Sequence, residues 1–267
     1  MPRIPCPKCR HTRSWNVRRG RLKCKKCRHE FGGNQYPVDG IRATEDDWRR
    51  CAAAFLRERS ILRVTEEAGR SHCLVERMLM ELRTRMAAVV PDPFRGPVEM
   101  DETYIGGQRK NKRLHIRRIK GKKGHGTEKL PIVGLFDRET GTVFVVVEPK
   151  KLDIAFIVQT VRERTFPGST IFTDGFKMYR CLPRHGYDHE YVDHDGGEYV
   201  RDDIHTNNIE GFWGILKRRM GCIGGMRRKY LYLFVGEIVW KFNHRRQSLK
   251  DQERTLIGLV LPKSLVA

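Results

Sequence analysis

The segment from residue 204 to residue 219, IHTNNIEGFWGILKRR, restricts the fold most, because as a helix it has two chemically different sides. At about 100° per residue, the polar stripe consists of Asn207, Glu210, Gly214 and Lys217. The opposite stripe is apolar and consists of Ile209, Phe212, Trp213, Leu216 and Met220. The apolar side therefore packs on a core. For Phe212 and Trp213, stacking on DNA bases is the weaker alternative, because both lie on that side. A carboxylate and an ammonium group on the other side suit a metal-bound phosphodiester, although an ordinary amphipathic helix with a charge pair would show the same pattern.

The charge of the chain narrows the class of partner. The 267 residues include 53 lysines and arginines against 32 acidic residues, and the net charge is +21. Such an excess favours a polyanion, here double-stranded DNA, although a ribosomal or histone-like protein shows the same bias. The sequence has no apolar run of about 18 residues, and its N-terminus lacks the apolar stretch of a signal peptide. We therefore expect no membrane partner and a cytoplasmic, nucleoid-associated protein with reduced thiols.

Four cysteines near the N-terminus have the spacing of a zinc ribbon. Cys6 and Cys9 form one C-x2-C pair, and Cys24 and Cys27 form the second after a spacer of fourteen residues. Four thiolates at this spacing bind structural Zn²⁺ in a tetrahedron. A thioredoxin-like redox site is the alternative, but it needs a single C-x-x-C pair in a larger α/β domain. Residues 1–40 are therefore predicted to be a zinc ribbon and a linker, with the metal supplying most of the stability.

Residues 41–92 show helical periodicity and predict a helix-turn-helix module. Thr44 precedes three acidic residues, as at a helix N-terminus. A short helix from residue 61, a turn at residues 69–71 and a second helix to residue 85 follow. The residues near the start of that second helix, and thus the predicted DNA contacts, are Arg70, His72 and Arg77. A plain three-helix bundle used for dimer contacts would give the same pattern.

The order of elements in residues 93–250 predicts an α/β catalytic domain of the RNase H-like type, a mixed sheet flanked by helices. Three strands are expected at 98–104, 130–136 and 142–148, then a helix at 153–164 and strands at 170–173 and 187–192. Helices from residue 206 and at about 229–245 complete the domain, and 251–267 is predicted to be a C-terminal tail. In this topology Asp101, Asp174 and Glu210 converge. Three carboxylates can hold two Mg²⁺ or Mn²⁺ ions for phosphodiester chemistry.

Two basic segments flank this expected site. An insertion at 106–129 carries, from Gln108 to Lys129, ten lysines and arginines against one acid, together with three spaced glycines. We interpret it as an arm that binds DNA, the alternative being a solvated insertion. Its predicted DNA contacts are Arg109, Lys110, Lys112, Arg113, Arg117 and Arg118. Arg218 and Arg219, which follow Lys217, are predicted to contact the backbone on the other side.

Three motifs give the chain a family resemblance. They are MDETYIGG at 100–107, FTDGFKMY at 172–179 and HTNNIEGFWGILKR at 205–218. Together with the cysteine pairs they resemble the DDE-type transposases of bacterial insertion sequences of the ISXO type, relatives of the eukaryotic Merlin elements. The resemblance extends from Cys6 to about Arg246. It implies that Asp101, Asp174 and Glu210 are the metal-binding triad and that Lys217 contacts DNA phosphate near the cut.

Two positions leave alternatives open. Related groups have asparagine as the third metal-site residue, and Asn207 lies on the same helical stripe as Glu210. We favour Glu210, because a carboxylate neutralises metal charge directly, and interpret Asn207 as a substrate contact. Glu102 adjoins Asp101, but alternation along a strand should turn it to the other face.

These observations predict a DNA transposase that binds terminal inverted repeats and performs metal-dependent strand cleavage and strand transfer. Since two ends must be joined, we expect a homodimer or a higher assembly. One alternative is a structure-specific nuclease or resolvase on the same fold, which would cut without joining. A second is a non-enzymatic zinc-ribbon regulator derived from a transposase.

Overall fold

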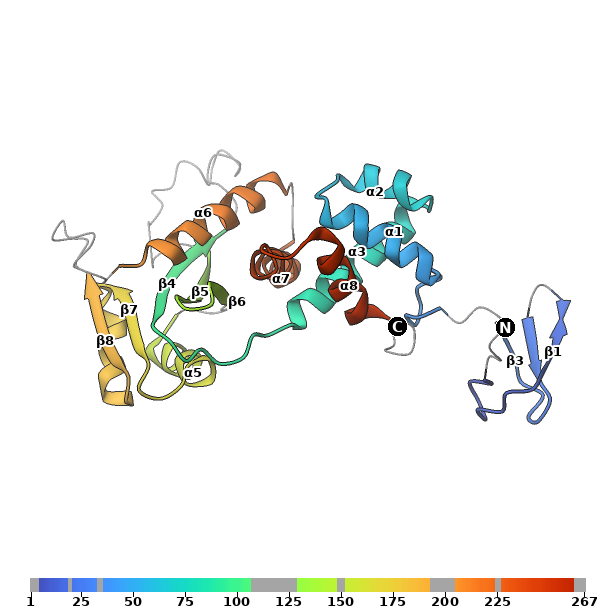
Figure 1. Ribbon diagram of the computed structural model, residues 1–267, viewed down its shortest axis with the longest axis horizontal. Helices are drawn as coiled ribbons and strands as arrows, with labels where there is room; N and C mark the ends of the chain where they lie inside the picture. The colour runs from blue at the N-terminus through green and yellow to red at the C-terminus, as the bar shows by residue number, and fades with distance from the viewer. Residues whose placement is uncertain are drawn as a thin grey trace, which may run out of the picture. The chain divides into compact units, whose positions relative to one another are not determined.

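The computed structural model describes residues 5–18, 21–32, 36–106, 129–147, 152–192, 205–223 and 227–261 (Figure 1). The chain divides into two compact units. The first comprises Met1–Leu82 and Ser248–Ala267, and the second comprises Arg83–Gln247. The division falls within helix α3, whereas the sequence predicted a domain boundary after residue 92. Among the described residues, no helix has the length and apolar character needed to cross a membrane.

The first unit begins with a small antiparallel sheet. Its strands are β1 (Ser14–Val17), β2 (Arg21–Cys24) and β3 (Glu30–Gly32), in the order β1-β2-β3. The apolar cluster beneath them is minimal: Phe31, Cys6 and Cys24 are buried, and Leu22 packs against them. So few apolar side chains cannot offset the entropy of ordering the segment. The stability of this sheet must therefore come from the cysteines.

The remainder of the first unit is helical. Helix α1 (Glu45–Leu56) begins with the predicted Thr44 cap, which forms a reciprocal capping box with Asp47. Helix α2 (Ile61–Ala68) ends at Gly69, whose φ of 62° is left-handed, and α3 (His72–Ala88) follows. The predicted pair of helices joined by a tight turn is thus present.

A fourth helix of this unit corrects the prediction of a tail at 251–267. Helix α8 runs from Leu249 to Val260 and is capped by Ser248, whose side chain accepts from the Asp251 N–H. Its residues Leu256, Ile257 and Val260 are buried, and α8 packs against α1. The apolar spacing across one helical face explains why this segment folds rather than remaining a tail.

The second unit is built on a mixed five-stranded sheet. Its strands are β4 (Val98–Ile105), β5 (Leu130–Asp137), β6 (Thr142–Val147), β7 (Thr170–Asp174) and β8 (Asp188–Val192). The order is β6-β5-β4-β7-β8, with β5 antiparallel to β4 and β6, and β7 parallel to β4 and β8. The predicted mixed sheet is thus present, and β4 is its central strand.

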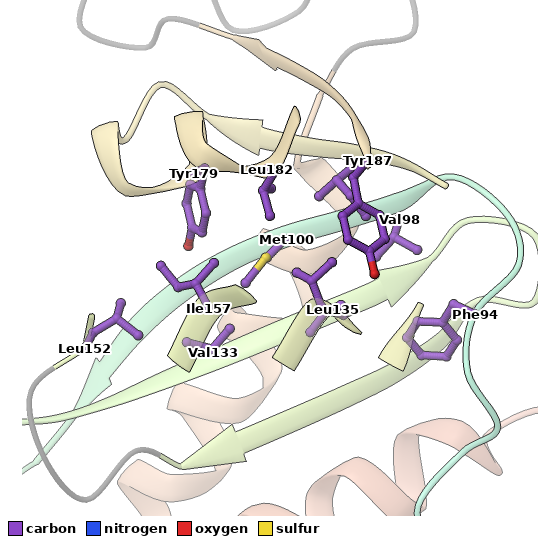
Figure 2. Packing of buried hydrophobic residues seen from close by; sticks show 12 residues of the cluster. Phe94, Val98, Met100, Val133, Leu135, Leu152, Ile157, Tyr179, Leu182 and Tyr187 are labelled. Carbon is purple, nitrogen blue, oxygen red and sulfur yellow. The ribbon is translucent and has the colours of Figure 1, made fainter. Parts of the chain in front are cut away.

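One face of the sheet is covered by α5 (Ile154–Arg164) and the 3-10 helix η4 (Lys177–His185). Figure 2 shows the cluster between them, in which Val98 and Met100 of β4 meet Ile157 and Tyr179. Each of these four side chains is fully buried. The even-numbered residues at the start of β4 therefore belong to this face, as strand alternation requires.

The opposite face is covered by α6 (Asn207–Cys222) and α7 (Leu231–Asn243), the latter preceded by the short 3-10 helix η6 (Arg228–Tyr230). The predicted apolar stripe of α6 is buried in this second core against β5 and β6. The predicted polar stripe, which includes Asn207, Glu210 and Lys217, is exposed. The two-sided character of α6 is thus confirmed.

Gly134 of β5 allows α6 to approach the sheet closely. It pairs with Asp101 of β4, and a Cβ at this position would lie 2.5 Å from Cη2 of Trp213 and 2.9 Å from Cδ1 of Ile209. The Trp213 ring cannot move away freely, because its Nε1 donates to Asp101 Oδ2 at 2.9 Å. The glycine is therefore required by the packing of α6.

We expect the Gly134→Ala substitution to destabilise the second unit by about 1–3 kcal/mol, the usual cost of overpacking a core. Gly211→Ala on α6 is the matched control, because a Cβ there meets no atom within 4 Å. That variant should be neutral or more stable by up to about 1 kcal/mol, since alanine favours a helix. Urea unfolding of the three proteins measures both changes, and equal midpoints for the two variants would contradict this prediction.

Candidate active site and metal centre

Asp101 lies in the middle of the central strand, on the face covered by α6. One oxygen of its carboxylate, Oδ2, accepts the indole N–H of Trp213 at 2.9 Å. Strand pairing places Asp101 opposite Gly134, so the carboxylate lies beside the point of closest helix approach. The side chain is only partly exposed. Its environment is therefore a half-buried edge of the second core.

Asp174 and Glu102 complete a group of carboxylates around this position. Asp174 is the last residue of β7, and its Oδ1 accepts the Phe176 N–H at 3.1 Å. Glu102 accepts the hydroxyl of the buried Tyr179, so it faces the opposite side of the sheet from Asp101, as alternation predicted. The charge of Asp174 nevertheless acts on both acids. The two adjacent acids therefore lie on opposite faces of β4 but share the electrostatic influence of Asp174.

The electrostatics of this group are those of crowded acids. Burial raises the pKa of Asp101 to about 8, and the charges of Glu102 and Asp174 add to the effect. Burial likewise raises the pKa of Glu102 to about 7, against the opposing hydrogen bond from Tyr179. Carboxylates that raise one another's pKa are stabilised when a cation neutralises them. This donor set of hard oxygens fits a divalent ion such as Mg²⁺ or Mn²⁺.

The third predicted acid, Glu210, lies on the exposed stripe of α6. Its Oε1 accepts the hydroxyl of Thr206 at 2.8 Å. In the part of the chain that the structure describes, Asp101, Asp174 and Glu210 do not form a group with their ligand atoms in close range. Two of the three predicted residues are thus electrostatically coupled, and the third lies on the adjacent helix with its side chain turned to its own N-cap residue.

Glu99 is a site residue that the sequence did not reveal. It lies two positions before Asp101 on the same face of β4, is fully buried, and accepts hydrogen bonds from the first turn of α6. Buried carboxylates are retained where they are paired. Strand alternation was the available signal, since a carboxylate at 99 shares the face of Asp101 and must find donors there.

The four predicted cysteines form the one metal-ligand group that the described residues contain. All four Sγ atoms lie within 4.8 Å of one another, with 3.5 Å between those of Cys6 and Cys27 and also between those of Cys9 and Cys24. A tetrahedron with Zn–S bonds of about 2.3 Å has S–S edges of about 3.8 Å. The arrangement therefore fits a four-thiolate zinc site.

The backbone around the thiols also favours metal binding. The two C-x2-C loops are alike, because Arg10 and Arg28, each directly after a second cysteine, have φ values of 57° and 60°. Burial raises the pKa of the Cys24 thiol, but the backbone N–H groups of Cys27 and Lys26 outweigh it and hold that pKa at about 6. At Cys27, against a backbone hydrogen bond, burial and the neighbouring thiols raise the pKa to about 12. The thiolate is the form of cysteine that ligates metal, so the backbone N–H groups at Cys24 favour a ligand at that position.

Comparison with known proteins identifies the second unit. Residues 93–243, more than half of the chain, match the model of the ISXO2-like transposase domain. The chain belongs to this transposase family. A protein of the transposable element ISH50 from Halobacterium salinarum is 29% identical over 213 residues, 77% of this chain and 70% of that protein. A transposase-like protein from Haemophilus influenzae is 28% identical over 118 residues, 44% of this chain and 93% of that protein.

Two solved structures are also similar to this transposase at low identity. One is the HTLV-2 integrase catalytic core domain in complex with magnesium, which is 12% identical in sequence. The match spans 56% of this chain and 85% of the integrase chain, with a TM-score of 0.32. The other is the simian T-cell lymphotropic virus intasome in complex with a PP2A regulatory subunit, which is also 12% identical in sequence. That match spans 72% of this chain and 67% of the intasome chain, with a TM-score of 0.35.

The predicted DNA contacts of the transposase fall into three groups. Arg70 Nε donates to the buried carboxylate of Asp47 at 2.8 Å, and Arg77 Nη2 donates to the Gly40 carbonyl at 2.5 Å, so both side chains hold the helical module together. His72 is exposed and lies 3.7 Å from Glu76. On α6, Arg218 is exposed and Arg219 is half-buried. The contacts predicted in the basic insertion, from Arg109 to Arg118, lie outside the described residues.

We expect Asp101→Asn to be more stable than the wild-type protein in EDTA, by a margin that grows as pH rises from about 5 to about 8. The raised pKa of about 8 means that Asp101 stays protonated when folded but ionises when unfolded, which costs stability as pH rises towards that value. Asparagine keeps an oxygen for the Trp213 N–H. Urea unfolding at several pH values tests this, and a less stable variant at pH 8 would contradict it.

Removing one cysteine of the quartet should remove zinc. We expect the wild-type protein to carry about one Zn²⁺ per chain and Cys24→Ser to carry none, because a four-thiolate site loses its charge balance and geometry with one ligand missing. Cys73→Ser is the control, since Cys73 is exposed and outside the quartet. Metal analysis by mass spectrometry measures the zinc content, and retention of zinc by Cys24→Ser would exclude this site.

Proposed function

We propose that this transposase binds the ends of its element and performs metal-dependent cleavage and joining of DNA strands. The observation that carries the proposal is the coupled carboxylate pair of Asp101 and Asp174, on adjacent strands of a domain that matches the ISXO2-like transposases. Carboxylates whose pKa is raised by burial and by other acids are typical of sites that bind cations or move protons. Because the chain belongs to a transposase family, we propose that the substrate of these acids is DNA.

Asp101, Asp174 and Glu210 would hold Mg²⁺ or Mn²⁺. When bound, two such ions activate the attacking oxygen and stabilise the leaving oxygen of a phosphodiester. The protein's own contribution would be to bring the Glu210 carboxylate, which here accepts from Thr206, to the pair on β4 and β7. Trp213 occupies one oxygen of Asp101 and so leaves the other oxygen for the ion. On the other face of the sheet, the Tyr179 hydroxyl donates to Glu102 and holds the direction of that carboxylate.

The exposed stripe of α6 is where we propose that the DNA backbone lies. Lys217 and Arg218 are exposed there, beyond Glu210. A Cβ added at Gly211 or Gly214 would meet no atom within 4 Å, so the backbone of a polyanion can approach the helix closely. Lysine and arginine at such a surface neutralise phosphates without reading sequence. We therefore assign Lys217 and Arg218 to substrate positioning.

Recognition of the element ends is proposed for the first unit. The zinc ribbon presents exposed Trp15, over whose ring Lys25 and Arg28 lie at 5.6 Å and 5.2 Å. Of the three DNA contacts predicted in the helical module, Arg70 bonds to Asp47 and Arg77 bonds to a backbone carbonyl. His72, at the start of α3, has neither bond, and we propose it as the DNA contact of this module. Because Arg70 and Arg77 hold that module together, we propose a structural role for both. Two ends must be joined, which requires a dimer or a larger assembly.

Asp174→Asn should abolish cleavage and strand joining while leaving end binding unchanged, because it removes one negative charge from the cation site but alters no DNA contact. The measurement is nicking of supercoiled plasmid carrying the element's ends in Mn²⁺, followed by strand transfer from pre-cut ends. Glu163→Gln on α5 is the matched control, since its exposed carboxylate lies on the opposite side of the sheet from α6.

Full activity of Asp174→Asn would sink the proposal, and wild-type cleavage without joining would indicate a nuclease or resolvase. End binding without any cleavage by the wild-type protein would indicate a regulator. The same assay on Glu210→Gln and Asn207→Ala decides which of the two α6 residues serves as the third metal ligand. The true ligand is the one whose loss abolishes cleavage at every Mn²⁺ concentration.

A further inference from the structure

The N-terminus of α6 is capped from another element. Helices α1, α2, α5 and α8 each begin with a residue whose side chain accepts a backbone N–H of its own first turn. Thr206, the N-cap residue of α6, makes no such bond, and its hydroxyl donates to Glu210 instead. The free N–H groups of a helix start need an acceptor. For α6 that acceptor is supplied by the central strand.

Glu99 of β4 supplies it. Its Oε2 accepts the backbone N–H groups of Asn208 at 2.9 Å and of Ile209 at 3.0 Å, and its Oε1 accepts the Asn208 side-chain amide at 2.7 Å. A carboxylate at this end also meets the positive pole of the helix dipole. A cap within one helix stabilises only that helix, whereas this cap fixes the helix start to the sheet.

Arg138 connects the cap to the other strands of the site. Its Nε donates to Glu99 Oε1 at 2.9 Å, and its Nη2 donates to the His205 carbonyl at 2.6 Å. Its guanidinium lies over the ring of Phe172, on the strand that ends at Asp174, at 4.0 Å. His205 Nδ1 lies 3.3 Å from Glu99 Oε1. The cluster therefore touches β4, β7 and the start of α6, the three elements that carry the proposed metal ligands.

The helix is held to β4 at a second point by Asp101, which accepts from Trp213. Glu99 and Asp101 are two residues apart on one face of the strand, and their partners on α6 are Ile209 and Trp213. Glu210 lies between these two attachment points. A helix held at both points cannot rotate or slide, so the direction in which residue 210 leaves the helix is fixed relative to Asp101.

We propose that Glu99 is a positioning residue of the transposase, which sets the place of Glu210 relative to Asp101 and Asp174 without touching metal or DNA. This inference rests on the proposed function, since it assigns Glu99 to the same site. Loss of the Glu99 charge should weaken both N–H bonds and release the start of α6. Groups that orient metal ligands typically change metal affinity or activity by about 10- to 100-fold when removed.

The test is Glu99→Gln, which keeps the size of the side chain and loses its charge. The first readout is the Mg²⁺ titration of the Trp213 indole N–H signal in the ¹⁵N–¹H spectrum, because this group bonds to Asp101. The signal is assigned by its loss in Trp213→Phe. We expect the midpoint for Mg²⁺ to rise by about tenfold or more. The second readout is the Mn²⁺ dependence of plasmid nicking, which should shift in the same direction while end binding is unchanged.

Glu237→Gln is the matched control in the same unit. Glu237 is a mostly buried acid on α7 that accepts from Arg83 and Lys241 at 2.7 Å and 2.8 Å, so its loss also breaks a buried ion cluster. It should lower stability without changing the Mg²⁺ midpoint. If Glu99→Gln fails to fold, Asn208→Ala removes one donor of the cluster and keeps both backbone bonds, and a smaller shift in the same direction is expected.

The outcomes separate the two proposals. A wild-type protein that shows Mg²⁺-dependent shifts and nicking, with the Glu99→Gln midpoint unchanged, overturns the role of Glu99 and leaves the proposed function standing. Equal shifts of the midpoint in Glu99→Gln and Glu237→Gln would show a general loss of stability and also overturn it. A wild-type protein with neither metal-dependent signal nor nicking would overturn both proposals.

Discussion

The attachment of α6 to the central strand is the constraint on which the rest of the site depends. Strand β4 alternates between two cores, so that Val98 and Met100 pack against α5 and η4 while Glu99 and Asp101 meet α6. A slip of one residue would exchange these faces, burying the wrong set of side chains. The same alternation that builds the core thus decides which polar groups reach α6. Gly134, opposite Asp101, leaves room for the Trp213 ring of α6 to lie against the sheet.

Much of this arrangement follows from sequence because the signals are periodic. The buried stripe of α6, the helix cap at Thr44 and the order of strands and helices along the second unit were all predicted from spacing and order. The cysteine spacing likewise predicted a quartet of thiols that the structure brings together. Such predictions succeed because each depends on near neighbours or on a repeat that one element imposes on its own residues.

The features that the sequence did not reveal depend mostly on partners distant in sequence. Glu99 has no local sign of its role, because its donors at Asn208 and Ile209 lie more than a hundred residues away. The sequence likewise gave no sign that Arg70, a predicted DNA contact, would pair with Asp47 on another helix. Helix α8 was mistaken for a tail, although Ser248 and the spacing of Leu256, Ile257 and Val260 were available as signals. Position at the end of the chain outweighed periodicity in that prediction.

The acids of the second unit differ in how their charges are balanced. This difference distinguishes the acids that stabilise the fold from those that we propose to bind metal. Glu99 has Arg138 and two helix N–H groups as donors, and Glu237 has Arg83 and Lys241, whose charges help to hold its pKa below the ordinary value. Asp101 accepts hydrogen bonds from neutral donors, the Trp213 indole and the Glu102 backbone, while burial and the neighbouring acids raise its pKa. A fold selected for stability alone would replace such an acid with an uncharged residue. The acids whose pKa is raised are therefore the ones that a divalent cation would stabilise, whereas the paired acids hold the helices that present them.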